Sequence, residues 1–286
     1  MFDRRTKNVE IFRDTCQAIK ESNTLQNAVT NSIKEQKLFI EGKDCNYDIK
    51  NLKRDAMCRV VVSGKRTFEA AEPYAKDEKR VAVLNFASAT NPGGGVIKGS
   101  SAQEEALCRC STLYPCLNIE MMWEQFYGPH READNPVYNN DILLTPDVMV
   151  FKSDIKFPER ISEKDWYKVD VITCAAPNLR HVPSNAMNPN AGSKAANLKW
   201  NAYTELMRDR VNQIFKVALT TGADVLILGA FGCGAFCNPP DVVAKLFKEA
   251  TDKYGNWFET IEFAVFHTDR EVANYDAFRK TFGVTI

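Results

Sequence analysis

The chain between Asn85 and Glu105 reads NFASATNPGGGVIKGSSAQEE and leads from an apolar run into a helical pattern. The apolar run, Arg80–Phe86, is almost continuously hydrophobic, which is typical of a strand buried on both faces of a sheet. A helix is predicted over Ala102–Leu113. The three consecutive glycines between them carry no Cβ, so a ligand can approach the backbone amides closely. This segment therefore predicts a strand, a binding loop and a helix in succession, with a flexible turn as the alternative for the loop.

The same succession recurs on both sides of this segment. From residue 58 onward, apolar runs alternate with helical patterns, which predicts an α/β fold of three layers around a largely parallel sheet. The predicted strands are Arg59–Val62, Arg80–Phe86, Val148–Phe151, Val169–Cys174, Asp224–Leu228 and Ile261–Phe266, and the predicted helices are Arg66–Ala75, Ala102–Leu113, Tyr203–Thr220 and Pro240–Tyr254. Ligands of such folds bind beyond the carboxyl ends of the strands, so we expect the site in the loops after Phe86, Cys174 and Leu228.

Three stretches lie outside this alternation. Residues 1–57 are interpreted as an extension, with two helices over 5–36, beside a core that spans 58–286. The acid-rich run Glu132–Asp141 is interpreted as a solvated loop. The stretch Asn178–Lys199 is rich in Asn, Pro, Ala and Ser and is interpreted as a long loop, either a lid or a disordered segment.

Composition excludes several classes of protein. The 286 residues include 37 Lys+Arg and 37 Asp+Glu, and this zero net charge argues against retention on nucleic acid or an anionic membrane by bulk charge. No apolar run reaches the roughly 18 residues of a membrane-spanning helix, and the charged N-terminus argues against a secretory signal. The nine cysteines suit neither a disulfide framework nor a metal site. We expect a cytoplasmic monomer with reduced thiols and no metal.

A second glycine-rich loop, GAFGCGAFCNPP, spans Gly229–Pro240 and follows the predicted strand Asp224–Leu228. It has neither a Walker Lys-Ser/Thr pair nor a GxGxxG spacing, so its own signal for phosphate binding is modest. Two such loops at the ends of two buried strands are able to close on one diphosphate from opposite sides, since backbone amides at loop–helix junctions attract anions.

Gln103, Glu104 and Glu105 begin the predicted helix after the three glycines. The stretch Ser101–Glu104 fits the capping box S/T-x-x-E, in which Glu104 is only a helix-start residue. In the catalytic alternative, adjacent helical residues diverge by about 100°, so the two glutamates are not expected to face each other across a bond as in ordinary glycosidases. One would then transfer the proton and the other would hold a substrate hydroxyl.

The motif N-P-G-G-G, followed by seven residues and Q-E-E over Asn91–Glu105, resembles the signature of poly(ADP-ribose) glycohydrolases. The segments Val169–Asn178 and Leu226–Pro240 are similar to those of the microbial-type branch, and the resemblance covers about residues 58–286 in the same order. It implies a macrodomain, which is a three-layer α/β/α sandwich with a mixed, largely parallel sheet. It also implies ADP-ribose as the ligand, hydrolysis of the ribose–ribose bond of poly(ADP-ribose), and no cofactor.

The same resemblance implies roles for individual residues. Glu105 is expected to act as general acid and then as base, while Glu104 orients the ribose at the scissile bond and Gln103 supports both. The residues expected to contact ADP-ribose are Asn91, Gly93, Gly94, Gly95, Val96, Gly232, Cys233, Gly234, Ala235 and Phe236. A buried glutamate with a raised pKa suits this chemistry, because it can protonate the leaving oxygen and later accept a proton from water.

Two other functions stay open from the sequence. One is a non-catalytic ADP-ribose reader, and the other is a hydrolase that removes single ADP-ribose groups from a protein or a nucleobase. The second glutamate favours an enzyme, because a reader has no need of it. We expect the poly(ADP-ribose) to be attached to ADP-ribosylated proteins. Since this polymer is a polyanion, we also expect a modest basic groove at Lys98 and Arg109.

Overall fold

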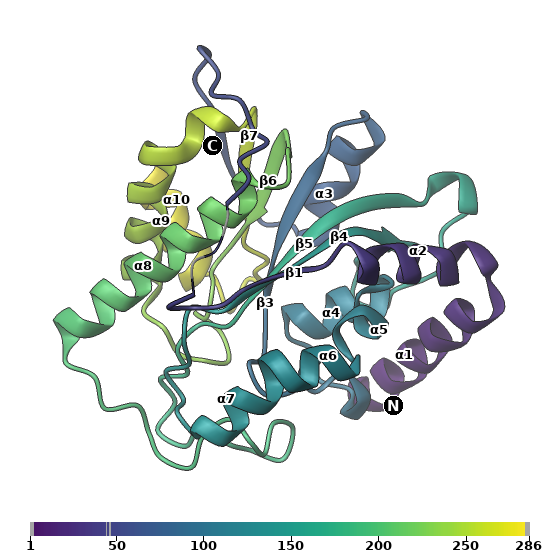
Figure 1. The fold of residues 1–286 in the computed structure, drawn as a ribbon, viewed down its shortest axis with the longest axis horizontal. Coiled ribbons are helices and arrows are strands. Elements are labelled where there is room, and N and C mark those ends of the chain that lie inside the picture. Colours follow the sequence, from purple (N-terminus) through teal and green to yellow (C-terminus); the bar gives the residue numbers. More distant parts are fainter. Residues whose placement is uncertain (1–2, 44, 46, 284–286) are drawn as a thin grey trace.

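A sheet of seven strands runs through the described part of the chain, residues 3–43, 45 and 47–283 of the computed structural model, and helices cover both of its faces (Figure 1). In spatial order the strands are β1 (Lys37–Phe39), β4 (Ile142–Val150), β5 (Tyr167–Cys174), β3 (Val81–Phe86), β6 (Val225–Leu228), β7 (Thr260–Ala264) and β2 (Arg59–Ser63). The strands from β5 to β2 pair in parallel, whereas β4 is antiparallel to both β5 and β1. The predicted mixed, largely parallel three-layer fold is confirmed.

The helices fall into two layers, one on each face of the sheet. The helices are α1 (Arg4–Glu21), α2 (Asn23–Lys34), α3 (Thr67–Lys76), α4 (Gln103–Cys110), α5 (Leu113–Leu117), α6 (Glu120–Met122), α7 (Gly128–Ala133), α8 (Trp200–Leu219), α9 (Pro240–Tyr254) and α10 (Ala273–Phe282). Strand β3 shows how the layers are built, because its side chains alternate between the faces. Ala82 and Leu84 join the hydrophobic cluster under α8, α9 and α10, while Val81 and Val83 join the cluster under α3, α4 and α5.

Two predicted elements have different bounds in the structure. Strand β4 begins at Ile142 rather than Val148, because Ile142–Leu144 already pairs with β5 before a bulge between Thr145 and Val148 interrupts the ladder. The helix predicted to reach Leu113 ends at Cys110, because Ser111 takes an extended conformation and forms a bridge with β4. Neither the short strand β1 nor helix α10 was expected from the sequence.

The N-terminal part forms the two expected helices, and Ser22 separates them. The Ser22 side chain accepts a hydrogen bond from the Leu25 amide at 3.3 Å and so begins α2. The chain then adds β1 to the edge of the sheet beside β4, so this part contributes a strand as well as helices. In Figure 1 the purple helices α1 and α2 lie on the α4 and α5 side of the sheet.

The acid-rich run Glu132–Asp141 is only in part the solvated loop expected from its composition, because residues 132–135 are exposed and residues 136–138 are buried. Val137 and Tyr138 are buried in it, because the fully buried Arg210 of α8 donates hydrogen bonds to both of their carbonyl oxygens, at 3.1 and 3.3 Å. None of the helices in the described residues is long and apolar enough to cross a membrane.

Candidate active site

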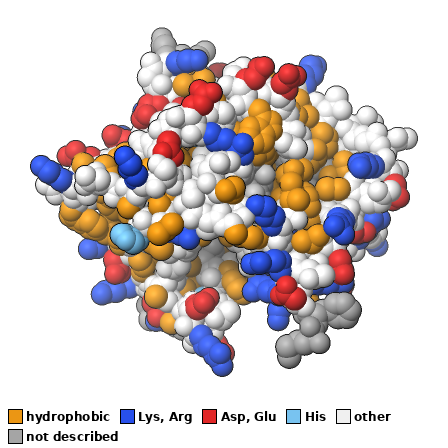
Figure 2. Space-filling model, turned by 90° about the horizontal axis from the view of Figure 1, so that it is seen from below, with side chains coloured by type: hydrophobic (Ala, Val, Ile, Leu, Met, Phe, Trp, Pro, Cys, Tyr) orange, Lys and Arg blue, Asp and Glu red, His pale blue; other side chains and the backbone are white. Residues whose placement is uncertain are grey.

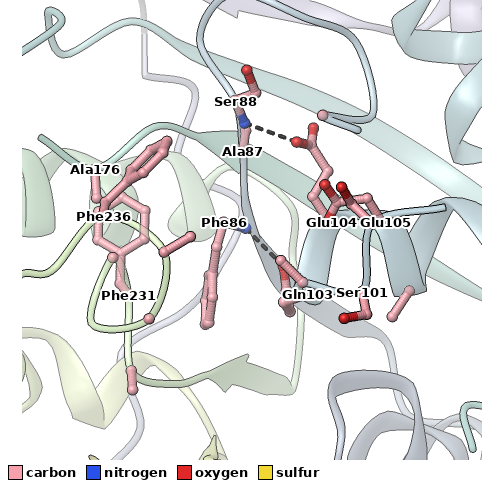
Figure 3. Close-up of a pocket in the computed structure, with 18 of the residues that line it drawn as sticks. Phe86, Ala87, Ser88, Ser101, Gln103, Glu104, Glu105, Ala176, Phe231 and Phe236 are labelled. Atoms are coloured by element: carbon pink, nitrogen blue, oxygen red, sulfur yellow. Dashed lines mark hydrogen bonds between the residues drawn. The ribbon is translucent and has the colours of Figure 1, made fainter. Parts of the chain in front are cut away.

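A cavity of about 480 Å³ opens at the carboxyl ends of β3, β6 and β7, and the loops expected after Phe86, Cys174 and Leu228 all contribute to its wall. Its volume lies in the usual range for small-molecule sites. Figure 3 shows two contrasting sides. Gln103, Glu104 and Glu105 of α4 form one side, and Phe231 and Phe236 of the second glycine-rich loop form the other.

The Gln103 side chain joins three elements at the edge of the cavity. Its Oε1 accepts a hydrogen bond from the Phe86 amide at 2.9 Å, at the end of β3. Its Nε2 donates to the Leu84 carbonyl oxygen at 2.7 Å and to Thr67 Oγ1 at 3.0 Å, at the start of α3. Every hydrogen-bonding group of the amide is therefore used to fix the start of α4 against the sheet, and none is directed at a ligand.

Glu104 is turned toward β3 and away from the start of its own helix. Its carboxylate accepts hydrogen bonds from the Ser88 amide at 2.8 Å and from Asn85 Nδ2 at 3.4 Å. Because the residue that caps α4 is Ala102, without a side-chain hydrogen bond, the capping-box alternative for Glu104 is wrong. Burial, followed by the neighbouring charge of Glu105, raises the pKa of Glu104 well above its usual value.

Glu105 holds one carboxylate oxygen in place and leaves the other free. Its Oε1 accepts a hydrogen bond from the Gly95 amide at 2.9 Å. Its Oε2 is buried and has no hydrogen-bond partner among the described residues. Burial also raises the pKa of this carboxyl group. A buried polar atom without a partner is uncommon in folded proteins, so this oxygen points to a ligand.

The two carboxylates meet beside Gly94. Gly94 has a φ of +57°, and a Cβ added there would lie 2.7 Å from Glu105 Oε1 and 3.0 Å from Glu104 Oε2. Both carboxylates therefore reach the same glycine, while the expectation that they do not flank a bond stays a prediction. Side chains of a helix lean toward its N-terminus, and these two are long enough to converge there on the glycine loop.

The other residues expected to bind ADP-ribose divide into two groups. On the cavity wall lie Gly94, Gly95, Gly232, Gly234, Ala235 and Phe236. Away from the wall lie Asn91, Gly93, Val96 and Cys233. Apart from Gly93, which has no side chain, the members of the second group use their side chains within the protein. Val96 and Cys233 pack on the hydrophobic clusters, and Asn91 exchanges hydrogen bonds with Asn188 and Arg131.

The long loop Asn178–Lys199 covers part of the cavity, which the sequence alone did not show. It contributes Arg180, Pro183, Asn185, Met187 and Asn188 to the wall. Asn188 fastens the loop to the first glycine-rich loop, because its Nδ2 donates to Ser88 Oγ at 3.1 Å and its Oδ1 accepts from Thr90 Oγ1 at 3.0 Å. The only sequence signal for this role was the length and composition of the loop.

The basic residues at the cavity are not the ones expected. Arg109 is buried and donates to the Ser100 carbonyl oxygen at 2.6 Å, so its expected place in a basic groove is wrong. Lys98 is exposed but does not line the cavity. The cations that line the wall are Lys65, Arg66 and Arg180. On the face seen from below, Figure 2 shows Lys and Arg side chains among hydrophobic ones.

Comparisons with known proteins agree with this geometry. The family model described as the microbial-type PARG catalytic domain matches residues 7–153. The chain is similar to the crystal structure of poly(ADP-ribose) glycohydrolase from Thermomonospora curvata, with 27% identity, 97% of this chain and 100% of that chain covered, and a TM-score of 0.78.

Two liganded structures are also similar. The T. curvata enzyme bound to the inhibitor ADP-HPD has 27% identity, covers 96% of this chain and 99% of its own, and gives a TM-score of 0.78. The Deinococcus radiodurans enzyme in complex with ADP-ribose has 28% identity, covers 89% of this chain and 97% of its own, and gives a TM-score of 0.75. No curated protein matches the chain.

Proposed function

The chain belongs to the microbial-type poly(ADP-ribose) glycohydrolase family, and from this premise we propose how its own residues cleave the polymer. It is a glycoside hydrolase that acts on poly(ADP-ribose). The observation that carries the proposed mechanism is the buried, unpartnered Oε2 of Glu105 on the cavity wall. In the bound polymer, this oxygen lies next to the ribose–ribose O-glycosidic bond that is cleaved.

Glu105 transfers the proton in both halves of the reaction. In its protonated form it donates the Oε2 proton to the leaving oxygen as the bond from ribose C1 to that oxygen breaks, which leaves an oxocarbenium-like sugar. A water molecule then bonds to C1 and gives its proton to the Glu105 carboxylate. The products are free ADP-ribose and a shorter polymer, which carries a new hydroxyl group where the bond was broken. The raised pKa of Glu105 supports the first half, because it favours the protonated form that donates the proton.

Glu104 holds the ribose for this attack. Its carboxyl group is fixed by the Ser88 amide and by Asn85, beside the place where Glu105 acts, and its remaining lone pairs can accept hydrogen bonds from the sugar hydroxyls. The amides of Gly232, Gly234, Ala235 and Phe236 in the second glycine-rich loop bind the diphosphate, whereas the Cys233 amide donates to the Ala230 carbonyl oxygen at 3.1 Å. Gly234 supports this assignment, because no atom lies within 4 Å of a Cβ added there, which leaves open space beside the backbone.

The partners and the setting of the enzyme are part of the same proposal. ADP-ribose is the product ligand and poly(ADP-ribose) on ADP-ribosylated proteins is the substrate, without a role for nucleic acid or a membrane surface. We propose a cytoplasmic monomer. All nine cysteines are unpaired in the structure, which suits a reducing compartment.

The substrate class is tested by offering the protein three substrates in parallel. These are purified poly(ADP-ribose), a mono-ADP-ribosylated protein and a mono-ADP-ribosylated nucleobase, with released ADP-ribose followed by chromatography. We expect rapid release from the polymer and much slower release from the other two. Release from a single-group substrate alone would show a mono-ADP-ribosyl hydrolase, and ADP-ribose binding without any release would show a reader.

A further inference from the structure

Helix α1 holds both ends of the segment that carries the catalytic glutamates. We call residues Gly99–Arg109 the glutamate segment. Asn8 Nδ2 donates to the Gly99 carbonyl oxygen at 3.0 Å, and Thr15 Oγ1 contacts the Arg109 carbonyl oxygen at 2.6 Å. Asn8 and Thr15 are each 1% exposed and lie seven residues apart, which is about two turns on the same face of a helix. Neither residue lines the cavity.

The fit between α1 and the start of the segment is close. Gly99 has a φ of +79°, and a Cβ added there would lie 2.4 Å from the Arg5 carbonyl oxygen. The backbone of α1 therefore lies directly against this glycine. Within the segment, the guanidinium of Arg109 donates to the Ser100 carbonyl oxygen at 2.6 Å, which ties the end of the segment back to its beginning.

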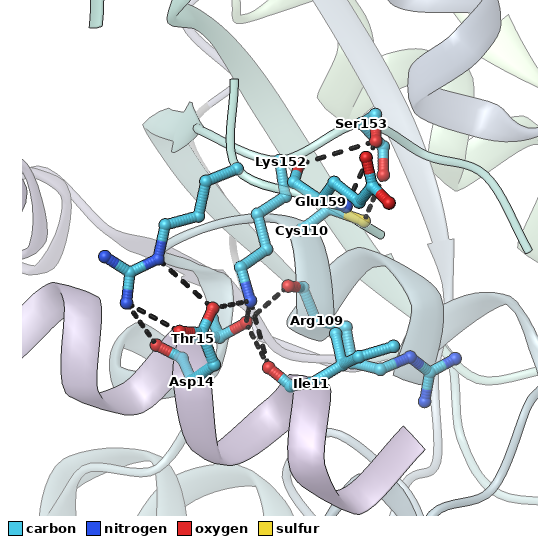
Figure 4. A network of polar contacts seen from close by, with 9 residues as sticks. Ile11, Asp14, Thr15, Arg109, Cys110, Lys152, Ser153 and Glu159 are labelled. Atoms are coloured by element: carbon cyan, nitrogen blue, oxygen red, sulfur yellow. Dashed lines mark hydrogen bonds and ion pairs between the residues drawn. The ribbon is translucent and has the colours of Figure 1, made fainter. Parts of the chain in front are cut away.

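A buried lysine fixes α1 in this position (Figure 4). Lys152 is 1% exposed, and its Nζ donates to the Ile11 carbonyl oxygen at 3.0 Å, to Thr15 Oγ1 at 2.7 Å and to Asp14 Oδ2 at 2.7 Å. All three N–H groups of the Lys152 ammonium therefore donate to atoms of α1. A buried ammonium without these partners would be strongly destabilising, so α1 is held where all three contacts form.

This lysine also sets the direction of the Thr15 hydroxyl. Because Lys152 donates to Thr15 Oγ1, the oxygen acts as an acceptor there, and its own hydrogen is left for a carbonyl oxygen. The Arg109 carbonyl at 2.6 Å is closer to this oxygen than the Ile11 carbonyl at 3.0 Å. Since the Ile11 carbonyl already accepts from Lys152, and since the Arg109 carbonyl is closer, the Thr15 hydrogen bond to the glutamate segment is favoured.

We propose that α1 positions the glutamate segment for hydrolysis, with Asn8 and Thr15 as positioning residues, an inference that rests on the proposed function. Glu105 lies within the segment, so a small displacement of the segment moves its free oxygen relative to the bond. The second glycine-rich loop lies after β6 and has no part in these contacts. The chemical step therefore depends on α1, while most of the binding of ADP-ribose does not.

The test uses the full chain with Asn8→Ala and Thr15→Val. We expect kcat on poly(ADP-ribose) to fall about tenfold in each, because misplacing a reacting group by a fraction of an ångström is costly. The Kd for ADP-ribose, from calorimetry, stays within about twofold of wild type. Thr15→Ser keeps the hydroxyl and restores kcat. Gln17→Ala is the matched control, since among the described residues this exposed amide of α1 bonds only to Glu21 of the same helix.

Loss of a buried hydrogen bond also lowers stability, so a second control separates the two effects. Ile214→Val removes one methyl group from α8, in the cluster on the other face of the sheet. If the α1 variants lower kcat no more than Ile214→Val at a similar loss of Tm, or weaken ADP-ribose binding as much as kcat, the inference is overturned. Wild-type protein that releases no ADP-ribose would instead overturn the proposed function, and the inference with it.

Discussion

The two glycine-rich loops at the cavity are similar in composition but use glycine for different purposes. In the first loop, Gly94 leaves room for the protein's own carboxylates, which come within 2.7 and 3.0 Å of the place where a Cβ would be. In the second loop, Gly229–Pro240, there is no charged side chain, and Gly234 borders open space. The comparison teaches that glycine serves catalysis in one loop and ligand binding in the other.

Gly94→Ala should produce the largest effect, and it tests the first loop. The new methyl group would meet Glu105 Oε1 at a backbone conformation that side chains rarely adopt, so the carboxylates must move. We expect kcat to fall about 100-fold, with a smaller change in the Kd for ADP-ribose. Steady-state kinetics and calorimetry measure the two values. A variant with wild-type kcat would show that the carboxylates do not depend on this glycine.

Gly234→Ala is the matched change in the second loop and should have the reverse pattern. The methyl group would meet no protein atom within 4 Å, and Gly234 lines the cavity, so we expect the methyl group to compete with the ligand. We expect the Kd for ADP-ribose to rise about tenfold, equivalent to about 1.4 kcal/mol, while kcat at saturating polymer stays within about twofold. If kcat of Gly234→Ala fell as much as kcat of Gly94→Ala, the claim that one loop serves catalysis and the other serves ligand binding would be refuted.

Glu104→Gln tests whether the carboxylates beside the first loop carry an electrostatic cost, which is measured as a change in protein stability. Burial and the charge of Glu105 raise the pKa of Glu104, so the folded protein binds more protons than the unfolded chain between the usual and the raised pKa. Wild-type stability therefore falls as the pH rises through that window, by about 1.4 kcal/mol for each unit of the shift. The variant avoids this loss, and Asn85 Oδ1, which has no partner among the described residues, is able to accept from the new amide.

We thus expect the Tm of Glu104→Gln to be higher than that of wild type at about pH 8, with a smaller difference at about pH 4. Thermal unfolding across this range measures it. A variant less stable than wild type at every pH would show that Glu104 is buried as a well-compensated anion.

Asn188→Ala should have the smallest effect and concerns the loop that covers the first glycine-rich loop. It removes the hydrogen bonds to Ser88, Thr90 and Asn91, which are partly buried. We expect the KM for poly(ADP-ribose) to rise about threefold with little change in kcat. Asn190→Ala, an exposed asparagine of the same loop, is the control. Equal effects of the two changes would contradict a specific role for Asn188.

Local patterns in the sequence were sufficient to predict the parallel core of the sheet and to find the catalytic motif. Strands β3 and β6 are apolar over nearly their whole length, which can be recognised without knowing their partners. Glu104 and Glu105 were found because their motif is contiguous in the sequence. The same does not hold for β1, whose three residues form a strand only because β4 lies beside them.

What the sequence did not show depends on contacts between distant residues. Arg109 counts as a surface cation in the sequence, but α1 and the glutamate segment bury it. The convergence of Glu104 and Glu105 depends on Gly94, ten residues from Glu104 on another element. The place of the loop Asn178–Lys199 depends on hydrogen bonds to several distant residues, among them Ser88, Lys98 and Tyr138. Such contacts follow from the fold and have no local signature.

The most direct test of the central claim compares wild type with Glu105→Gln, with Glu124→Gln as an exposed control. The new amide oxygen can still accept from the Gly95 amide, so the loop keeps its shape, but the proton donor is lost. We predict that release of ADP-ribose from the polymer falls by at least about 100-fold, while calorimetry gives a Kd for ADP-ribose within about threefold of wild type. Hydrolysis by Glu105→Gln at the wild-type rate would contradict the account.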